Sequence, residues 1–179
     1  MKKDSLSFLC CPRCLGDLTL NGEKIDHDEI TSGSLLCQSC SKEYPIVDGI
    51  PDFLLSEFLN EKDRRWMREY DSMARSYDII MSYLVPLISV GQSSFERYMW
   101  VRALHVKKGA HVLDVSTGTG VNLPFIHRQV GSNGRLAAMD ISKGMLTYAQ
   151  AKIKRKRWKN IELHRANASH LPYKNNTFD

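Results

Sequence analysis

The chain has 179 residues, enough for one ordinary domain or for one and a half small ones. Its most apolar stretch, residues 79–90, is about a dozen residues long and contains Pro86, whereas a membrane-spanning helix needs about twenty. The basic start of the chain is followed by an apolar run that Asp4 and Ser7 interrupt, so we expect no signal peptide. We therefore expect a core helix in residues 79–90 rather than a membrane span, and predict a cytoplasmic protein.

The net charge of +5 is distributed unevenly along the chain. Residues 1–55 carry five basic and nine acidic side chains, residues 56–108 carry nine and seven, and residues 109–179 carry eleven and four. An acidic beginning and a basic end indicate separate modules that attract one another. We predict three parts with these same bounds.

Two cysteine pairs dominate the first module, residues 1–55. Both have the spacing C-x-x-C, and they lie about two dozen residues apart. Zinc binds four thiolates in a tetrahedron, and each short loop can present two sulfurs to one side of the ion. Two disulfides are the alternative, which a reducing cytoplasm disfavours. The predicted zinc ligands are Cys11, Cys14, Cys37 and Cys40.

Cys10 is the odd thiol of the set. We expect it to lie outside the metal site, although its position next to Cys11 leaves a register shift of one residue open. Residues 17–20 and 34–36 are predicted β segments, with turns at Asn21-Gly22 and Asp48-Gly49.

The cysteine spacing is embedded in a longer pattern. L-x-C-P-x-C-x-G-x-L, followed by C-x-x-C-x-x-x-Y-P-I-x-D-G-I-P, covers nearly all of the first module. This pattern resembles a small zinc-ribbon family whose free-standing members bind and activate methyltransferases that modify tRNA, ribosomal RNA and release factors. The resemblance implies a methyltransferase domain as a partner, or as the next domain of the same chain.

Residues 56–108 are expected to be helical throughout. Ser56 is a candidate cap for the first helix. Residues 91–94 break the pattern, and a second helix is predicted from about residue 95 to about residue 106. The candidates for the buried face of that helix are Tyr98, Trp100, Val101 and Leu104.

The stretch E-Y-D-S-M-A-R-S-Y-D, residues 69–78, resembles a segment that precedes the core of many small-molecule methyltransferases. The quinone-biosynthesis C-methyltransferases are among them, and in these relatives the segment covers the cofactor. The resemblance makes Tyr77 a candidate lid residue. Packing of this tyrosine on the core is the alternative.

The third module begins with H-V-L-D-V-S-T-G-T-G, residues 111–120, which reads as a buried strand entering a glycine turn. A helix is predicted over residues 121–130, where Pro124 is tolerable because it lies in the first turn. Strand, glycine turn and helix in this order are typical of a nucleotide-type site in an open α/β sheet.

The residues around the turn indicate the class of ligand. A dinucleotide fingerprint would need glycine where Leu123 stands, and the chain has no G-K-[ST] phosphate loop. Asp114, just before the turn, would repel a phosphate and attract a cation. S-adenosylmethionine fits this site because it carries a sulfonium and an ammonium group and no phosphate.

The sequence D-V-S-T-G-T-G, residues 114–120, resembles the first motif of class I S-adenosylmethionine-dependent methyltransferases, D/E-x-G-x-G-x-G. Ser116 stands where that family has glycine. A second strand is predicted over residues 135–139, and D-I-S-x-x-M-L from Asp140 resembles the family's second motif. The family's aspartate there binds both ribose hydroxyls, and Met145 would pack near the adenine.

A third strand is predicted over residues 161–164, and the N-A-x-x-L-P-Y that follows resembles the family's D-A-x-x-L-P-F. Asn167 replaces an aspartate that accepts a hydrogen bond from the adenine amino group, and its amide oxygen is a weaker acceptor. The cofactor-binding residues that the resemblance implies are Asp114, Ser116, Thr117, Gly118, Gly120, Asp140, Ile141, Met145, Asn167 and Ala168.

Residues 152–159 contain six basic side chains around Trp158. They can be interpreted as a phosphate-binding and base-stacking surface for RNA, or as a solvated helix end whose charge suits the helix dipole. The chain also ends near a predicted fourth strand, N-N-T-F-D. A class I core resembles a seven-stranded sheet, so a longer chain or an oligomer is expected to cover the open sheet edge.

The predicted fold is therefore α/β: the first half of a Rossmann-like sheet after a helical segment and a β-rich zinc ribbon. The predicted function is S-adenosylmethionine-dependent methylation of a small molecule. The alternatives are RNA methylation and a zinc-ribbon adaptor without catalytic activity. No residue of the chain is identified as catalytic, and the methyl acceptor is not indicated.

Overall fold

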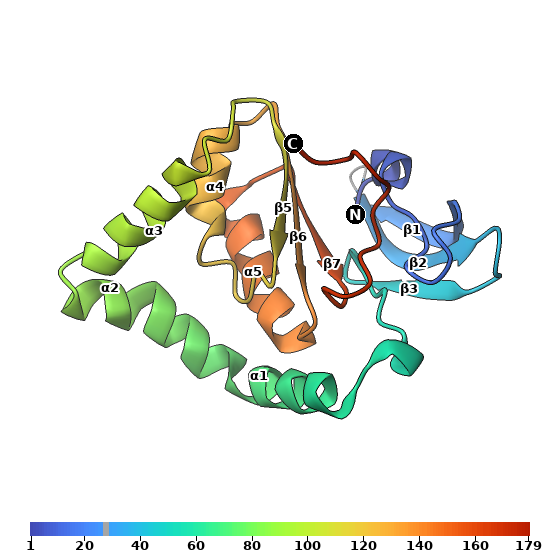
Figure 1. Ribbon diagram of the computed structural model, residues 1–179, viewed down its shortest axis with the longest axis horizontal. Helices are drawn as coiled ribbons and strands as arrows, with labels where there is room; N and C mark the ends of the chain where they lie inside the picture. The colour runs from blue at the N-terminus through green and yellow to red at the C-terminus, as the bar shows by residue number, and fades with distance from the viewer. Residues whose placement is uncertain (27–28) are drawn as a thin grey trace.

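The computed structural model describes residues 1–26 and 29–179. Its strands form two sheets, one of four strands in the order β1-β2-β3-β4 and one of three in the order β5-β6-β7. Figure 1 shows the first sheet beside β7 of the second, with α1 running past the lower ends of β5, β6 and β7. The predicted α/β architecture, with a small β domain first and a Rossmann-like half-sheet last, is confirmed.

The ribbon sheet is more regular than the sequence indicates. β1 (Leu18–Asp26) pairs antiparallel with β2 (Glu29–Cys37). The predicted turn at Asn21-Gly22 is wrong, because β1 continues through it with a register shift between Asn21 and Lys24. Gly22 has φ +62°. An irregularity in the pairing therefore uses the left-handed conformation that glycine permits, and the chain does not reverse there.

The second half of the ribbon follows the prediction. β3 (Glu43–Val47) pairs antiparallel with β2 and with the short β4 (Ile50–Pro51). The turn between β3 and β4 is at Asp48-Gly49, where φ is +53° and +82°. The short helical turn η1 (Lys3–Ser7) precedes this sheet at the start of the chain.

The first long helix, α1 (Glu61–Ile79), begins later than predicted, after a short turn η2 (Ser56–Phe58). Asn60 caps it: its side chain accepts a hydrogen bond from the backbone N–H of Asp63 at 2.8 Å, and the Asp63 carboxylate accepts one from the N–H of Asn60 at 3.2 Å. A capping box of this kind needs a polar acceptor three residues after the cap. Asn60 has one, whereas three residues after Ser56 the chain has Leu59.

The helical segment continues through a π-helical turn, η3 (Ile80–Leu84), into α2 (Val85–Ile88). The next helix, α3 (Gln92–Ala103), begins directly after Gly91. Both its first and its last residue lie earlier in the chain than predicted. Val101 is buried and Tyr98 is half-buried, but Trp100 and Leu104 are each 66% exposed, so the predicted buried face is wrong for these two. α3 packs against α4 and also contacts α2.

The second sheet is parallel and alternates with helices. Its elements are β5 (His111–Val115), α4 (Leu123–Val130), β6 (Arg135–Asp140), α5 (Lys143–Lys156) and β7 (Ile161–Arg165). Figure 1 shows α4 and α5 on the same face of this sheet. β6 is the central strand. β5 lies at an edge in the part of the chain that the structure describes, and its residues are half-buried or exposed, so the prediction of a buried strand is wrong there.

Side chains of β6 point alternately into two cores. Leu136 and Ala138 pack with buried residues of α4 and α5. Ala137 and Met139 point to the other face of the sheet, where residues of the ribbon lie against them. The ribbon and the second sheet therefore share a hydrophobic core, so the two modules are packed as one body.

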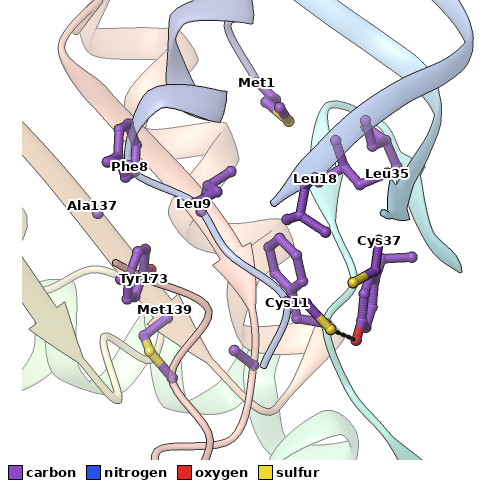
Figure 2. Packing of buried hydrophobic residues seen from close by; sticks show 14 of the residues in the cluster. Met1, Phe8, Leu9, Cys11, Leu18, Leu35, Cys37, Ala137, Met139 and Tyr173 are labelled. Carbon is purple, nitrogen blue, oxygen red and sulfur yellow. Dashed lines mark hydrogen bonds between the residues drawn. The ribbon is translucent and has the colours of Figure 1, made fainter. Parts of the chain in front are cut away.

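Figure 2 shows this shared core from close by. Phe8 and Leu9 lie between the ribbon and the second sheet, near Ala137 and Tyr173. Single β-bridges join Leu9 to Tyr173 and Asp52 to Arg165, so backbone pairing continues from one module into the other. The ribbon covers one edge and part of one face of the second sheet. Residues near both ends of the chain, Phe8, Leu9 and Tyr173, take part in this contact.

The arm formed by η3, α2 and α3 exposes several large apolar side chains. Leu87 is 76% exposed, Ile88 is 70% exposed and Val90 is 93% exposed. Across the described ranges, the structure contains no helix with the length and apolarity that a membrane crossing requires.

One buried histidine predicts how stability depends on pH. His164 on β7 is fully buried, and its Nδ1 lies 3.0 Å from the hydroxyl oxygen of Tyr173. Burial lowers the pKa of His164 from 6.5 to about 3. In the pH range between these values the unfolded chain binds a proton that the folded chain does not, so stability falls as the pH drops.

Replacing His164 by phenylalanine is expected to flatten the dependence of the unfolding free energy on pH between pH 6 and pH 4. The change in slope is at most about 1.4 kcal/mol per pH unit, the value for one proton. Urea unfolding at several pH values measures it. Because only slopes are compared, the lost contact with Tyr173 does not affect the result. Equal slopes in the two proteins would contradict the prediction.

Candidate functional site

Four thiols converge at one end of the ribbon. The sulfurs of Cys11, Cys14, Cys37 and Cys40 all lie within 4.8 Å of one another. The Cys11 and Cys40 sulfurs are 3.7 Å apart, and those of Cys14 and Cys37 are 3.4 Å apart. Sulfurs around a tetrahedral zinc ion are separated by roughly 3.8 Å, and those of a disulfide by about 2.05 Å. The donor set therefore fits one thiolate-bound metal ion.

Two neighbours define the surroundings of these thiols. The Tyr44 hydroxyl lies 3.0 Å from the sulfur of Cys11, the contact drawn as a dashed line in Figure 2. Burial, together with this contact, raises the pKa of Tyr44, so the hydroxyl stays protonated and can donate to a thiolate. Cys10 is buried outside the cluster, and its backbone N–H donates to the carbonyl of Pro172 at 3.0 Å.

The glycine turn lies between β5 and α4. Ser116, Gly118 and Gly120 all have left-handed backbones, with φ of +58°, +57° and +73°. A serine at such a position is strained, which explains why glycine is the usual residue there in the family that the motif resembles. The N–H of Thr117 donates to the carbonyl of Met139 at 2.9 Å, and this bond holds the turn against the end of β6.

Asp114 points to this turn. Its Oδ2 accepts a hydrogen bond from the Thr117 hydroxyl at 2.6 Å. Burial raises the pKa of Asp114, the bond from Thr117 opposes that shift, and the negative charge of Asp140 adds to it. The two carboxylates are thus near enough to repel each other, and a cation near both would relieve the repulsion.

Asp140 is tied directly to the glycine turn. Its Oδ2 accepts a hydrogen bond from the N–H of Gly118 at 2.8 Å, and its Oδ1 accepts one from the N–H of Ser142 at 2.9 Å. Burial raises the pKa of Asp140, and these backbone donors oppose the shift. The structure therefore brings together the two aspartates that the sequence analysis singled out, at the ends of neighbouring strands.

The start of α5 carries a contact that the sequence analysis missed. The Ser142 side chain caps α5 by accepting from the N–H of Met145 at 3.0 Å. Asp71 of α1 accepts from the Ser142 hydroxyl at 2.6 Å and from the N–H of Gly144 at 2.8 Å. The helical segment is thereby fastened to the loop that carries Asp140. The available signal was the position of Asp71 in the Y-D-x-x-A stretch.

The remaining candidates lie around the same strand ends. Met145 is buried, Ile141 is half-buried and Ala168 is exposed. Asn167, after β7, donates from Nδ2 to Asp63 at 3.3 Å, and its Oδ1 accepts from the N–H of Ser169 at 2.9 Å. The Asn167 oxygen has a second lone pair and can accept one further bond.

Two side chains of the basic tract, residues 152–159, make contacts within the fold. The Lys152 ammonium donates to Asp78 at 3.3 Å and to the carbonyl of Thr119 at 3.0 Å, and its side chain is only 10% exposed. Trp158 packs against His127 with ring centroids 4.9 Å apart. Neither side chain is freely available to a nucleic acid, which weakens the RNA interpretation of this tract.

Two family models match this chain, each over a different part of it. Residues 59–179 match the model of the ubiE/COQ5 methyltransferase family, and residues 2–49 match the model of Trm112p-like proteins. The first match covers all of the glycine turn and the strand ends described above. The second covers all four clustered thiols.

Two curated relatives that match this chain share one name. Demethylmenaquinone methyltransferase from Alkalihalophilus pseudofirmus is 32% identical over 66% of this chain and 48% of its own length. The enzyme of that name from Bacillus subtilis is 31% identical over 67% of this chain and 50% of its own. The chain thus spans about half the length of these relatives. A SAM dependent methyltransferase from Aquifex aeolicus superposes with a TM-score of 0.48 at 25% identity, over 61% of this chain and 53% of that one.

Proposed function

This chain belongs to the ubiE/COQ5 methyltransferase family, and from that premise we propose that its second sheet binds S-adenosylmethionine for methyl transfer to a small molecule. The observation that carries the proposal is the pair of carboxylates, Asp114 and Asp140, at one glycine turn with no phosphate-binding lysine in it. S-adenosylmethionine, when bound, supplies the methyl group and the positive charge.

The chain's own residues bind and orient this cofactor in our proposal. Asp140 accepts hydrogen bonds from the ribose hydroxyls, because a carboxylate that already accepts two N–H donors retains free lone pairs. Asp114 attracts the positively charged methionine end of S-adenosylmethionine. The turn residues Ser116, Thr117 and Gly118 contact the same end. The remaining proposed contacts to the adenosine are made by Gly120, Ile141, Met145, Asn167 and Ala168. Tyr77 remains a candidate lid residue.

We further propose that Cys11, Cys14, Cys37 and Cys40 hold one zinc ion that stabilises the ribbon. Supporting this are the mutual distances of the four sulfurs and the match to Trm112p-like proteins. A reducing compartment such as the cytoplasm would keep these thiols available for the metal. The proposed domains are residues 1–55 for the ribbon, 56–108 for the helical lid or linker segment and 109–179 for the cofactor-binding part.

The acceptor is proposed to be a small molecule of the quinone class, because the relatives are named for methylation of demethylmenaquinone. Apolar side chains on the arm of η3, α2 and α3 are compatible with such an acceptor. We assign no catalytic base. The non-catalytic adaptor, which would bind no cofactor, is the alternative that the next experiment separates.

Titration of the zinc-loaded chain with S-adenosylmethionine in a calorimeter tests the proposal. Binding in the micromolar range is expected for the wild type, with a loss of at least about tenfold in affinity for Asp140→Ala. Glu96→Ala, which removes an exposed carboxylate from α3, is the control and is expected to bind as the wild type does. A folded, zinc-loaded chain that binds no S-adenosylmethionine would favour the adaptor and overturn the proposal.

A further inference from the structure

Arg165, the last residue of β7, contacts all three parts of the chain. Its Nη1 donates to Asp52 Oδ2 of the ribbon at 2.7 Å, and its Nε donates to the carbonyl of Ile141 at 3.0 Å. Its Nη2 lies 3.2 Å from the sulfur of Met67 on α1. The planar guanidinium thus reaches the ribbon, the loop after β6 and the helical segment at the same time.

Backbone pairing accompanies the ion pair between Arg165 and Asp52. Asp52 forms a parallel bridge with Arg165, and the N–H of Phe53 donates to the carbonyl of Arg165 at 2.8 Å. The side chains of the ion pair are 18% exposed for Arg165 and 27% for Asp52. A pair so shielded is screened less by solvent than a surface pair, and its geometry is fixed by the backbone around it.

The other end of this contact lies next to Asp140. Ile141, whose carbonyl accepts the bond from Arg165, is the neighbour of Asp140 in the chain. The N–H of Ala166, the neighbour of Arg165, donates to the carbonyl of Asp140 itself at 3.1 Å. Any movement of Arg165 is therefore passed to the backbone that orients the Asp140 carboxylate.

We propose that Arg165 is a positioning residue through which the zinc ribbon sets the affinity of the second sheet for S-adenosylmethionine. The inference rests on the proposed function of that sheet. The ordered ribbon holds Asp52, Asp52 holds the guanidinium, and the guanidinium holds the loop from Asp140 to Ser142 in the geometry that receives the ribose. Binding of zinc and binding of S-adenosylmethionine are then coupled, and each strengthens the other by the same factor.

The experiment compares two ribbon carboxylates that pair with the second sheet. Asp52→Asn removes the charge opposite Arg165 and keeps the oxygen that accepts from the N–H of Leu54. Asp17→Asn breaks the ion pair between Asp17 and Lys174, which joins the same two modules at 2.7 Å but has no contact with the Asp140 loop. Arg165→Lys retains the positive charge and loses the forked geometry, so it provides a second variant at the proposed residue.

Calorimetric titration of the zinc-loaded proteins with S-adenosylmethionine gives the dissociation constants, with zinc content measured in parallel. Asp52→Asn and Arg165→Lys are each expected to weaken binding about tenfold while retaining one zinc per chain. Asp17→Asn is expected to remain within about twofold of the wild type. If the Asp52–Arg165 pair were merely structural, Asp52→Asn would lower stability and leave the affinity for S-adenosylmethionine unchanged.

The outcomes separate the two proposals. Wild-type binding with unchanged affinity in Asp52→Asn and Arg165→Lys overturns the role of Arg165 and leaves the cofactor site standing. Failure of the zinc-loaded wild type to bind S-adenosylmethionine overturns both. Removal of zinc by a chelator provides the reciprocal readout: the chelator concentration that releases half of the zinc rises when S-adenosylmethionine is present, and rises less in Asp52→Asn.

Discussion

Replacing Cys37 by alanine is expected to abolish stoichiometric zinc binding and to lower the free energy of unfolding by more than about 3 kcal/mol. Cys37 is 1% exposed, and its sulfur lies 3.4 Å from that of Cys14. Three thiolates cannot complete the tetrahedron that a structural zinc ion requires. Because Cys37 also belongs to the core that Leu9 and Met139 share, the loss extends beyond the ribbon into the second sheet.

Cys10→Ala is the matched control for this experiment. Cys10 is as deeply buried as Cys37, at 1% exposure, but its thiol lies outside the cluster. Both substitutions remove one buried sulfur, so the difference between them isolates the metal. Zinc content by mass spectrometry and unfolding in urea are measured for each. One zinc per chain retained in Cys37→Ala, or lost in Cys10→Ala, would show that the ligand set is wrong.

The second large effect is expected at the glycine turn. Gly120 has φ +73°, and a Cβ added there would lie 2.6 Å from Cδ1 of Leu123 and 3.3 Å from Cβ of Ala149. Leu123 is fully buried and cannot turn away without displacing its neighbours in the core of α4 and α5. Gly120→Ala is therefore expected to lower the free energy of unfolding by about 3 kcal/mol, from backbone strain and overpacking together.

Gly118→Ala separates these two contributions. Gly118 has φ +57°, so alanine is strained there as well, but an added Cβ meets no atom within 4 Å. The expected cost is about 1–2 kcal/mol from strain alone. Urea unfolding of both variants measures the difference. Equal losses would mean that Leu123 gives way, and that packing around the turn is looser than the structure indicates.

The metal and cofactor motifs could be read from the sequence because their chemistry depends on spacing within a few residues. Two C-x-x-C loops define a tetrahedral thiolate set wherever the chain brings them together, and the four sulfurs are indeed clustered. The turn after Asp114 needs small residues in left-handed conformations, and Gly118 and Gly120 have them. The parallel order of β5, β6 and β7 follows from alternation of strand and helix.

Predictions from local sequence were wrong at Asn21-Gly22, at Ser56 and at Trp100. Asn21-Gly22 is a strong turn signal, but pairing of β1 with β2 continues past it. Ser56 is a good cap by residue type, yet Asn60 has the reciprocal partner Asp63. Trp100 has the apolar side chain of a core residue and is exposed, because hydrophobicity does not specify which neighbour is present to cover it.

By itself the sequence determined the modules of this protein, the four thiols and the carboxylates beside the glycine turn, since each depends on residues close together in the chain. Only the tertiary structure decided that the ribbon packs on the face of β6 opposite α4 and α5. It alone also brought Asp71 to Ser142 and Asp52 to Arg165. The first of these contacts spans 71 positions of the chain and the second spans 113. No local pattern specifies which distant surfaces meet when apolar faces are buried.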